Sequence, residues 1–193
     1  MAMQDELTLL LQQTVQSPRV AARNLLDRNF PIGTAWLAIS LMAALSACLT
    51  GVSVLAAPEQ IEPNILVLFQ NPLQVALLQA AVMVVMAMLI QGVGRVFGGA
   101  GRFADALLLI AWTEAILCAL QLVQIVLVLV SPGIAAALGL FGLVLFVWVL
   151  ANFIAEMHGF ASAGKVLFGI IGTVLAMALA MAFVTVALVN MKG

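Results

Sequence analysis

Charged residues are scarce in this chain and are missing from most of its interior. They make up 8% of the sequence, against about 25% in ordinary soluble domains. The long stretches without any charged residue are 29–58, 63–94, 115–155 and 166–191. Apolar runs of this length cannot stay in water, so the chain is expected to cross a bilayer several times.

The chain also has no tyrosine and only two cysteines, Cys48 and Cys118. Any aromatic belt at the membrane surface therefore has to be built from Trp and Phe. Both cysteines fall inside apolar stretches, where we expect small buried packing residues and no disulfide framework. The net charge is −1, and no basic run suits a nucleic acid, so none is expected as a partner.

Turn signals divide the apolar residues into five segments, each close to the roughly 20 residues that a span needs. The run from Pro58 to Pro63 breaks the first, Asn71-Pro72 starts the second, and Ser131-Pro132-Gly133 splits the longest stretch into a tight hairpin. The sequence therefore predicts an all-α, polytopic membrane helix bundle in residues 31–193. Its predicted spans are 31–57, 71–94, 105–130, 134–157 and 165–190.

Basic residues set the expected orientation, because cytoplasmic loops carry an excess of Lys and Arg. With the N-terminus inside, six basic residues face the cytoplasm and Lys192 alone lies outside. The six are Arg19, Arg23, Arg28, Arg95, Arg102 and Lys165. We therefore expect a cytoplasmic N-terminus and a C-terminus outside. No cleavable signal peptide is evident before the first span, which is expected to act as an uncleaved anchor.

Residues 1–30 are too polar for a span and are expected to form a cytoplasmic or interfacial amphipathic segment. A mostly apolar stripe at helical spacing comprises Leu7, Leu10, Leu11, Thr14 and Val15. A second short helix should start at Ser17-Pro18. In one interpretation its apolar residues Ala21, Ala22, Leu25 and Leu26 face lipid while its arginines meet headgroups. In the other, the segment packs against the inner end of the bundle.

Glu114 is the one ionisable residue well inside a predicted span. It lies about 13 Å along the helix from Asp105, near the middle of a ~30 Å hydrocarbon core, where a charge is costly. Antiparallel pairing about the hairpin puts Gln121 near Gly142 and Gln124 near Gly139. It also puts Glu114 near Val149. These positions predict one polar seam between the third and fourth spans, formed by Glu114, Gln121, Gln124, Asn152 and Glu156.

Two interpretations of this seam stay open. In the first, the side chains bond across the helices and hold them together, as polar groups in membranes commonly do. In the second, they line a cavity for a proton, a solute or a lipid headgroup, because intramembrane acids are candidates for function.

Charges and glycines gather in the predicted inner loops. Expected at the inner interface are Arg95, Arg102, Asp105, His158 and Lys165, some of them as partners of Glu156. One histidine with one carboxylate is too few ligands for a metal. The glycines at 92, 94, 98, 99 and 101 follow no strand and lack the Lys-Ser/Thr of a phosphate loop, so they predict a tight turn and no nucleotide site. No cofactor is expected.

Two short motifs carry a family resemblance. The loop after the second span reads Phe97-Gly-Gly-Ala-Gly-Arg-Phe-Ala-Asp-Ala-Leu107, and the fourth span ends in Glu156-Met-His-Gly-Phe160 before Lys165. With five spans after an amphipathic start, the chain resembles the bacterial branch of the Yip domain family, the Ypt/Rab-interacting membrane proteins. The resemblance implies a multi-pass protein of the cell inner membrane. Eukaryotic relatives contact small GTPases through a longer N-terminal region with an Asp-Leu-Tyr-Gly-Pro type segment. This chain lacks that segment, so the resemblance does not carry GTPase binding over to it.

Two functions are compatible with these features. The first is a non-enzymatic protein that organises the membrane or scaffolds membrane proteins, through self-association or partner contacts along the fourth and fifth spans. There Gly172, Ala176 and Ala180 form a face suited to close helix packing. The second is a channel, transporter or lipid-moving protein that uses the polar seam. An enzyme is not expected, because no clustered nucleophile or metal set is visible.

Overall fold

The computed structural model describes residues 2–56, 69 and 71–190, and over these residues it is built from α-helices with no strand. The long helices are α1 (Ala2–Gln16), α2 (Pro18–Leu26), α3 (Ile32–Ala56), α5 (Pro72–Val96), α6 (Phe103–Val130), α7 (Pro132–His158) and α8 (Ala163–Asn190). Five of them, α3 and α5–α8, are long and apolar enough to cross a membrane. The expected all-α bundle with five candidate spans is confirmed. The predicted break from Pro58 to Pro63 lies outside the described residues.

Local sequence signals set the helix ends. The Asn71 side chain accepts hydrogen bonds from the backbone N–H groups of Leu73 and Gln74, at 3.0 and 3.3 Å, and Pro72 occupies the first helical position. Ser131 ends α6 and begins α7, which produces the predicted hairpin. Gly159 ends α7 with φ +72°, a left-handed conformation that glycine adopts without strain.

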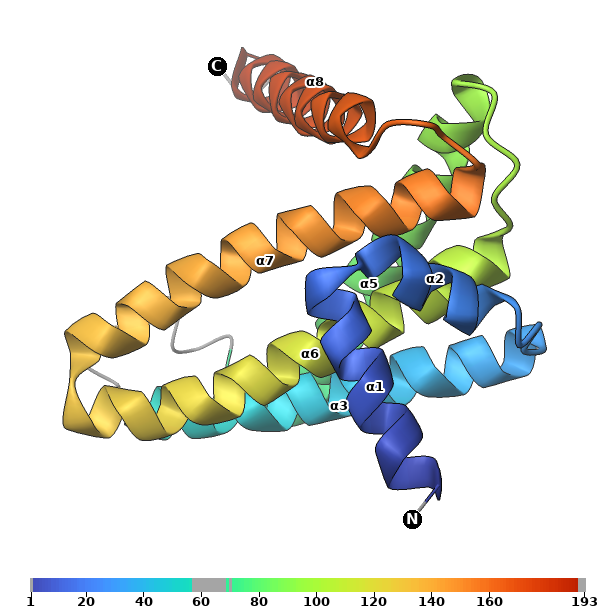
Figure 1. Cartoon of the computed structure of the whole chain (residues 1–193). Coiled ribbons are helices and arrows are strands. Elements are labelled where there is room, and N and C mark those ends of the chain that lie inside the picture. The colour runs from blue at the N-terminus through green and yellow to red at the C-terminus, as the bar shows by residue number, and fades with distance from the viewer. Residues whose placement is uncertain (1, 57–68, 70, 191–193) are drawn as a thin grey trace.

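Helix α6 is the centre of the bundle and packs against α3, α5 and α7. In Figure 1, α3, α6 and α7 run along a common direction, α1 crosses them, and α8 lies beyond α7. The core is formed mainly by alanine, leucine and isoleucine, with Phe153, Ile39 and Leu107 among its largest fully buried side chains. Cys118 is buried as expected, whereas Cys48 is exposed on α3, because a spanning helix always turns one side away from its neighbours.

Helix α8 joins the bundle only through its beginning. Val166 is buried, and Leu167 and Ile170 pack with it against Leu150 and Ile154 of α7. Most of the described side chains beyond Ile170 are exposed. This helix therefore presents a long apolar surface outside the bundle.

The apolar side of α2 is covered by protein. Ala21 and Ala22 have no exposed surface and Leu25 is buried with them in the main core, where α2 packs mainly against α7. The interpretation in which these three residues face lipid is therefore wrong, and packing against the bundle describes α2. The arginines on the same helix explain the difference: Arg23 pairs with Glu156 of α7 and Arg19 bonds the Phe160 carbonyl just beyond it, contacts that the sequence pattern did not include.

Helix α1 is tied to the bundle by a buried hydrogen bond. The Trp112 indole N–H of α6 donates to the Thr14 hydroxyl at 2.9 Å, and that hydroxyl donates in turn to the backbone carbonyl of Leu10 at 2.8 Å. Thr14 has no exposed surface. The hydroxyl thus links the N-terminal segment to the central helix.

Replacing Thr14→Val keeps the shape of the side chain but leaves the Trp112 N–H without its acceptor. We expect the free energy of unfolding to fall by about 1–2 kcal/mol, measured by denaturation of the purified protein in detergent. Thr8→Val is the matched control, because Thr8 is exposed on the same helix and its hydroxyl bonds only to the Gln4 carbonyl. Equal stability of the two variants would contradict the docking of α1 through Thr14.

Candidate functional site

Glu114 belongs to a polar cluster between α3, α5 and α6. The Gln79 side-chain amide of α5 donates to the Ser46 hydroxyl of α3 at 3.0 Å and to the Glu114 carboxyl of α6 at 3.1 Å. Two turns further along α3, the Ser53 hydroxyl accepts from the Gln121 amide at 3.4 Å. The polar cluster is therefore defined by Ser46, Ser53, Gln79, Glu114 and Gln121.

This placement corrects the predicted seam, because Glu114 and Gln121 turn toward α3 and α5 and not toward α7. Hairpin pairing predicts which positions of α6 and α7 lie at one height, but not which side of α6 faces α7. Leu120, one residue before Gln121, is the side chain close to Gly142: a Cβ on that glycine would lie 3.6 Å from it. The sequence does not show that α6 packs against α3 and α5 as well as against α7.

Gln124 does meet α7 where expected. Its side-chain amide donates to the Ala135 carbonyl at 3.2 Å. A Cβ placed on Gly139 would come within 2.9 Å of the Gln124 amide nitrogen. The missing side chain at Gly139 thus makes room for Gln124 and lets the two helices approach at this point.

The remaining two seam residues lie apart from the polar cluster. The Asn152 amide donates to the Trp148 carbonyl of its own helix at 2.9 Å. The Glu156 carboxyl receives the Arg23 side chain of α2, at 2.6 and 2.7 Å from two guanidinium nitrogens. The five predicted seam residues therefore occupy separate places in the bundle, and only Glu114 and Gln121 share one cluster.

Helix α2 holds the end of α7. Besides the Arg23–Glu156 ion pair, the Arg19 guanidinium donates to the Phe160 carbonyl at 2.9 Å. We expected Arg95, Arg102 or Lys165 to pair with Glu156. This is wrong, because the carboxyl pairs with Arg23 of α2. Lysine and arginine side chains near a helix C-terminus also interact favourably with its exposed carbonyls.

The other charges of this end are arranged more simply. Arg102 forms two hydrogen bonds with Asp105, at 2.8 and 2.9 Å, and the bonded carboxylate raises the pKa of the guanidinium above its ordinary value. Arg95, in the last turn of α5, and Lys165, in the first turn of α8, are exposed.

His158 is the centre of the contact between the end of α7 and the glycine-rich loop. Its Nδ1 accepts from the Gly101 N–H at 3.1 Å, so the proton is on Nε2, which donates to the Ile90 carbonyl at 3.1 Å. The ring stacks on Phe160, with ring centroids 5.3 Å apart. Both ring nitrogens are thus used by the backbone of neighbouring segments.

Gly94, Gly99 and Gly101 form the space that the imidazole fills, which we call the glycine pocket. A Cβ on Gly94 or Gly99 would lie 2.2 Å from a His158 ring nitrogen, and one on Gly101 would lie 2.9 Å from the ring. Gly98 adopts a left-handed conformation, with φ +83°, at the turn that the sequence predicted for this loop. Sequence reasoning missed the fit, although the lone histidine in an otherwise apolar span end was a signal that could have suggested it.

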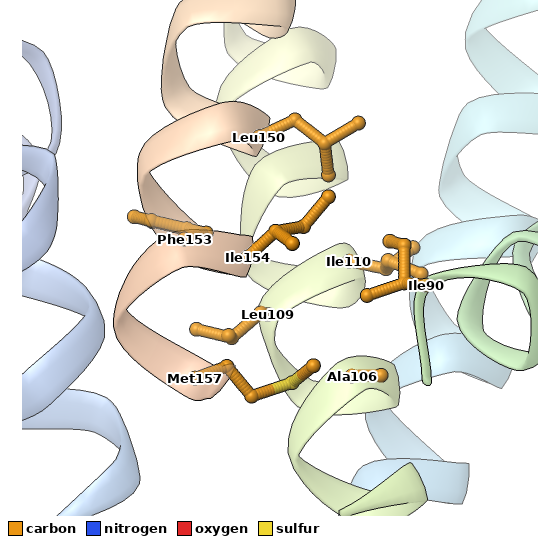
Figure 2. Close-up of a pocket in the computed structure, with 8 residues that line it drawn as sticks. All are labelled: Ile90, Ala106, Leu109, Ile110, Leu150, Phe153, Ile154 and Met157. Carbon is orange, nitrogen blue, oxygen red and sulfur yellow. The ribbon is translucent and has the colours of Figure 1, made fainter. Parts of the chain in front are cut away.

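A small gap lies between α5, α6 and α7 next to this end. Its volume is about 10 Å³, and Figure 2 shows the eight side chains around it: Ile90, Ala106, Leu109, Ile110, Leu150, Phe153, Ile154 and Met157. All are apolar, and the space is no larger than one water, so it suits neither a ligand nor an ordered water. Among the residues that the structure describes, no three His, Cys, Asp or Glu side chains could hold a metal together.

Comparison with protein families assigns the chain. A family model described as the Yip1 domain matches residues 13–184. The chain belongs to the Yip1 domain family. No curated protein and no solved structure is similar enough to give a match. The two motifs that carried the resemblance are in contact in this Yip1 domain protein, because His158 of one fills the glycine pocket of the other.

The glycine pocket gives a first test. In the Yip1 domain protein, Gly94→Ala would drive a methyl group into the His158 ring, and we expect the free energy of unfolding to fall by about 1–3 kcal/mol. Gly92→Ala is the matched control: it lies two residues earlier on α5, has open space around its Cβ position, and should be neutral or stabilising by up to about 1 kcal/mol. Chemical denaturation of both proteins in detergent measures the difference.

A companion variant keeps this test specific to the ring. In a His158→Ala background, the added loss caused by Gly94→Ala should be smaller than in the native chain, since the ring is gone. A loss of the same size in both backgrounds would show that the ring does not occupy the glycine pocket.

The polar cluster gives a second test. Gln79→Leu removes the amide that bonds Ser46 and Glu114, and we expect it to lower the free energy of unfolding by about 1 kcal/mol. Glu114→Gln keeps an acceptor oxygen for Gln79 and should leave stability nearly unchanged. Gln74→Leu, an exposed position on the same helix, controls for the loss of a glutamine. A large loss in Glu114→Gln would mean that the carboxyl itself, and not the hydrogen bond, is what the helices require.

Proposed function

We propose that this Yip1 domain protein is a non-enzymatic membrane protein that organises the cell inner membrane or scaffolds other membrane proteins there. In this proposal the N-terminus is cytoplasmic, the C-terminus is outside, and α8 is the element that meets a second copy or another membrane protein. The observation that carries it is the apolar helix that leaves the bundle after Ile170.

The surface of α8 supports a protein partner within the membrane. Gly172, Ala176 and Ala180 recur every fourth residue on one side, and all three are exposed. Small residues in this spacing let two helix backbones approach closely, which favours van der Waals packing in lipid. Larger exposed side chains, such as Phe183 at 76% exposure, lie on the same helix and can shield the contact between the two helices from lipid.

The polar side chains within the candidate spans favour a scaffold over a pathway for solute or lipid. Gln79 and Gln124 bond neighbouring helices, and Gln121 bonds α3, so their amides serve helix packing. Among the described residues, every buried side-chain nitrogen and oxygen has a hydrogen-bond partner. Side chains arranged in this way stabilise a bundle without a solvated path.

The second candidate is a channel, transporter or lipid-moving protein that works through the polar cluster. What favours it is Glu114, which is only partly buried and accepts a hydrogen bond from Gln79, whose amide also bonds Ser46 of α3. An ionisable group at this depth is a candidate for carrying a proton or contacting a headgroup. This candidate requires movement of solute or lipid by the purified protein.

Photo-crosslinking in living cells tests the scaffold. A photoreactive amino acid at Ala176 should give one discrete protein adduct, because this side of α8 contacts the partner. The same label at Met181, on the opposite side of the helix, should give little adduct. Equal labelling from both positions, or none from Ala176, would contradict the proposed contact surface.

Reconstitution into liposomes separates the two candidates. The scaffold predicts that ion flux and lipid scrambling stay at the level of protein-free vesicles. Flux in the native protein that is lost in Glu114→Gln, with folding intact, would assign the function to the polar cluster and remove the scaffold as the main role.

A further inference from the structure

Helix α1 has three differently occupied sides. Leu10 and Thr14 are buried against the bundle. Gln13 and Glu6 face α2, where Gln13 accepts a hydrogen bond from Asn24 at 2.7 Å and Glu6 pairs with Arg28. A third side carries an apolar stripe made of Leu7, Leu11 and Val15, which are four residues apart and 50%, 40% and 46% exposed. We call these three residues the α1 stripe.

The remaining sector of α1 is polar. It holds Asp5, Thr8, Gln12 and Gln16, all exposed, together with Leu9. The α1 stripe therefore lies between a polar sector and the protein-covered side, which is the pattern of a helix that lies in a membrane surface. Because α2 occupies the side of Gln13 and Glu6, roughly opposite the stripe, the stripe points away from the inner end that α2 covers.

The hydrogen bond to Trp112 sets the depth of α1. Trp112 is nine residues after the first residue of α6, which is about 14 Å along the helix axis. The 28 residues of α6 measure about 42 Å, against a hydrocarbon core of about 30 Å. If α6 is centred in the core, about 6 Å extends at each end, and Trp112 lies about 8 Å inside the hydrocarbon.

A second estimate starts from the far end. From Trp112 to Val130 is about 27 Å along the helix, and the hairpin there carries no charge that would keep it out of the core. If the core begins at this hairpin, Trp112 lies about 3 Å inside the opposite boundary. The first estimate lies within the depth of about 5–10 Å at which amphipathic helices bury their apolar side, and the second lies slightly nearer the headgroups.

We propose that α1 is a surface helix embedded in the leaflet at the inner end of the bundle, with the α1 stripe in contact with phospholipid acyl chains. Thr14 holds the helix to Trp112, and Gln12 and Gln16 remain at the level of the headgroups. In Figure 1, α1 crosses the direction of α3, α6 and α7, as a helix lying along the membrane plane must. The contact does not depend on whether α8 has a partner.

Lipid is favoured over a protein partner by the width of the stripe. Three side chains on one helix, bordered on one side by Thr8 and Gln12, would force a flat protein surface to cover these polar groups as well. Acyl chains can fill the narrow stripe while leaving the glutamines hydrated.

Spin labels read out the environment of α1 in the full-length protein. The protein carries Cys48→Ala and Cys118→Ala, a single labelled cysteine, and is placed in nanodiscs of phosphatidylethanolamine and phosphatidylglycerol. Accessibility to oxygen, which dissolves in acyl chains, is compared with accessibility to a water-soluble nickel complex. Leu7→Cys and Leu11→Cys report on the α1 stripe, and Gln12→Cys is the matched control one residue away.

We expect the ratio of oxygen to nickel accessibility to be several-fold higher at Leu7 and Leu11 than at Gln12. Equal ratios at Leu11 and Gln12, with nickel reaching both, would place α1 in water and overturn the proposal. Labels at Leu7 and Leu11 shielded from both reagents would show that protein covers the stripe, which also overturns it. Using two stripe positions keeps the test decisive if one variant does not fold.

Discussion

A polar group inside a bilayer has no water to bond, so it must find its partner within the protein, on its own helix or on a neighbouring one. The packing of this Yip1 domain protein is organised around that constraint. One glutamine amide, Gln79, links α3 and α6 from its place on α5. Gln124 bonds the backbone of α7, and Trp112 bonds Thr14 of α1. Each bond joins two different helices, so a few polar groups help to set which helices are neighbours.

The end of the bundle where α5 and α7 finish follows the same rule with backbone groups. The loop after α5 and the end of α7 expose N–H and C=O groups that the helices do not satisfy. His158 accepts a hydrogen bond from the Gly101 N–H of this loop and donates to the Ile90 carbonyl of α5, and Arg19 bonds the Phe160 carbonyl just beyond α7. The glycines of the loop matter because they leave room for the imidazole ring. Loop and helix end therefore act as one unit, to which α2 adds the Arg23–Glu156 ion pair.

Much of the architecture was predictable from composition and turn chemistry. The helices α3 and α5–α8 begin and end within two residues of the predicted spans, because long apolar runs and Asn-Pro or Ser-Pro boundaries act locally. The candidate site was less predictable. Gln124 met Gly139 as expected, while Glu114 and Gln121 turned to α3, and Glu156 paired with Arg23 of α2. Hydrophobic periodicity is nearly absent in spans that are apolar on all sides, so it cannot show which side meets which neighbour.

The amino-acid sequence by itself determined that the chain is helical, that five segments can span a membrane, and where the turns between the described helices fall. These properties depend on residues close together in the chain and on the cost of placing charge in lipid. Only the tertiary structure decided that the polar residues divide among separate contacts, that α2 packs on α7, and that three glycines receive a histidine 57 or more residues away. Such pairings depend on how helices rotate about their axes, and that rotation is set by all their neighbours at once.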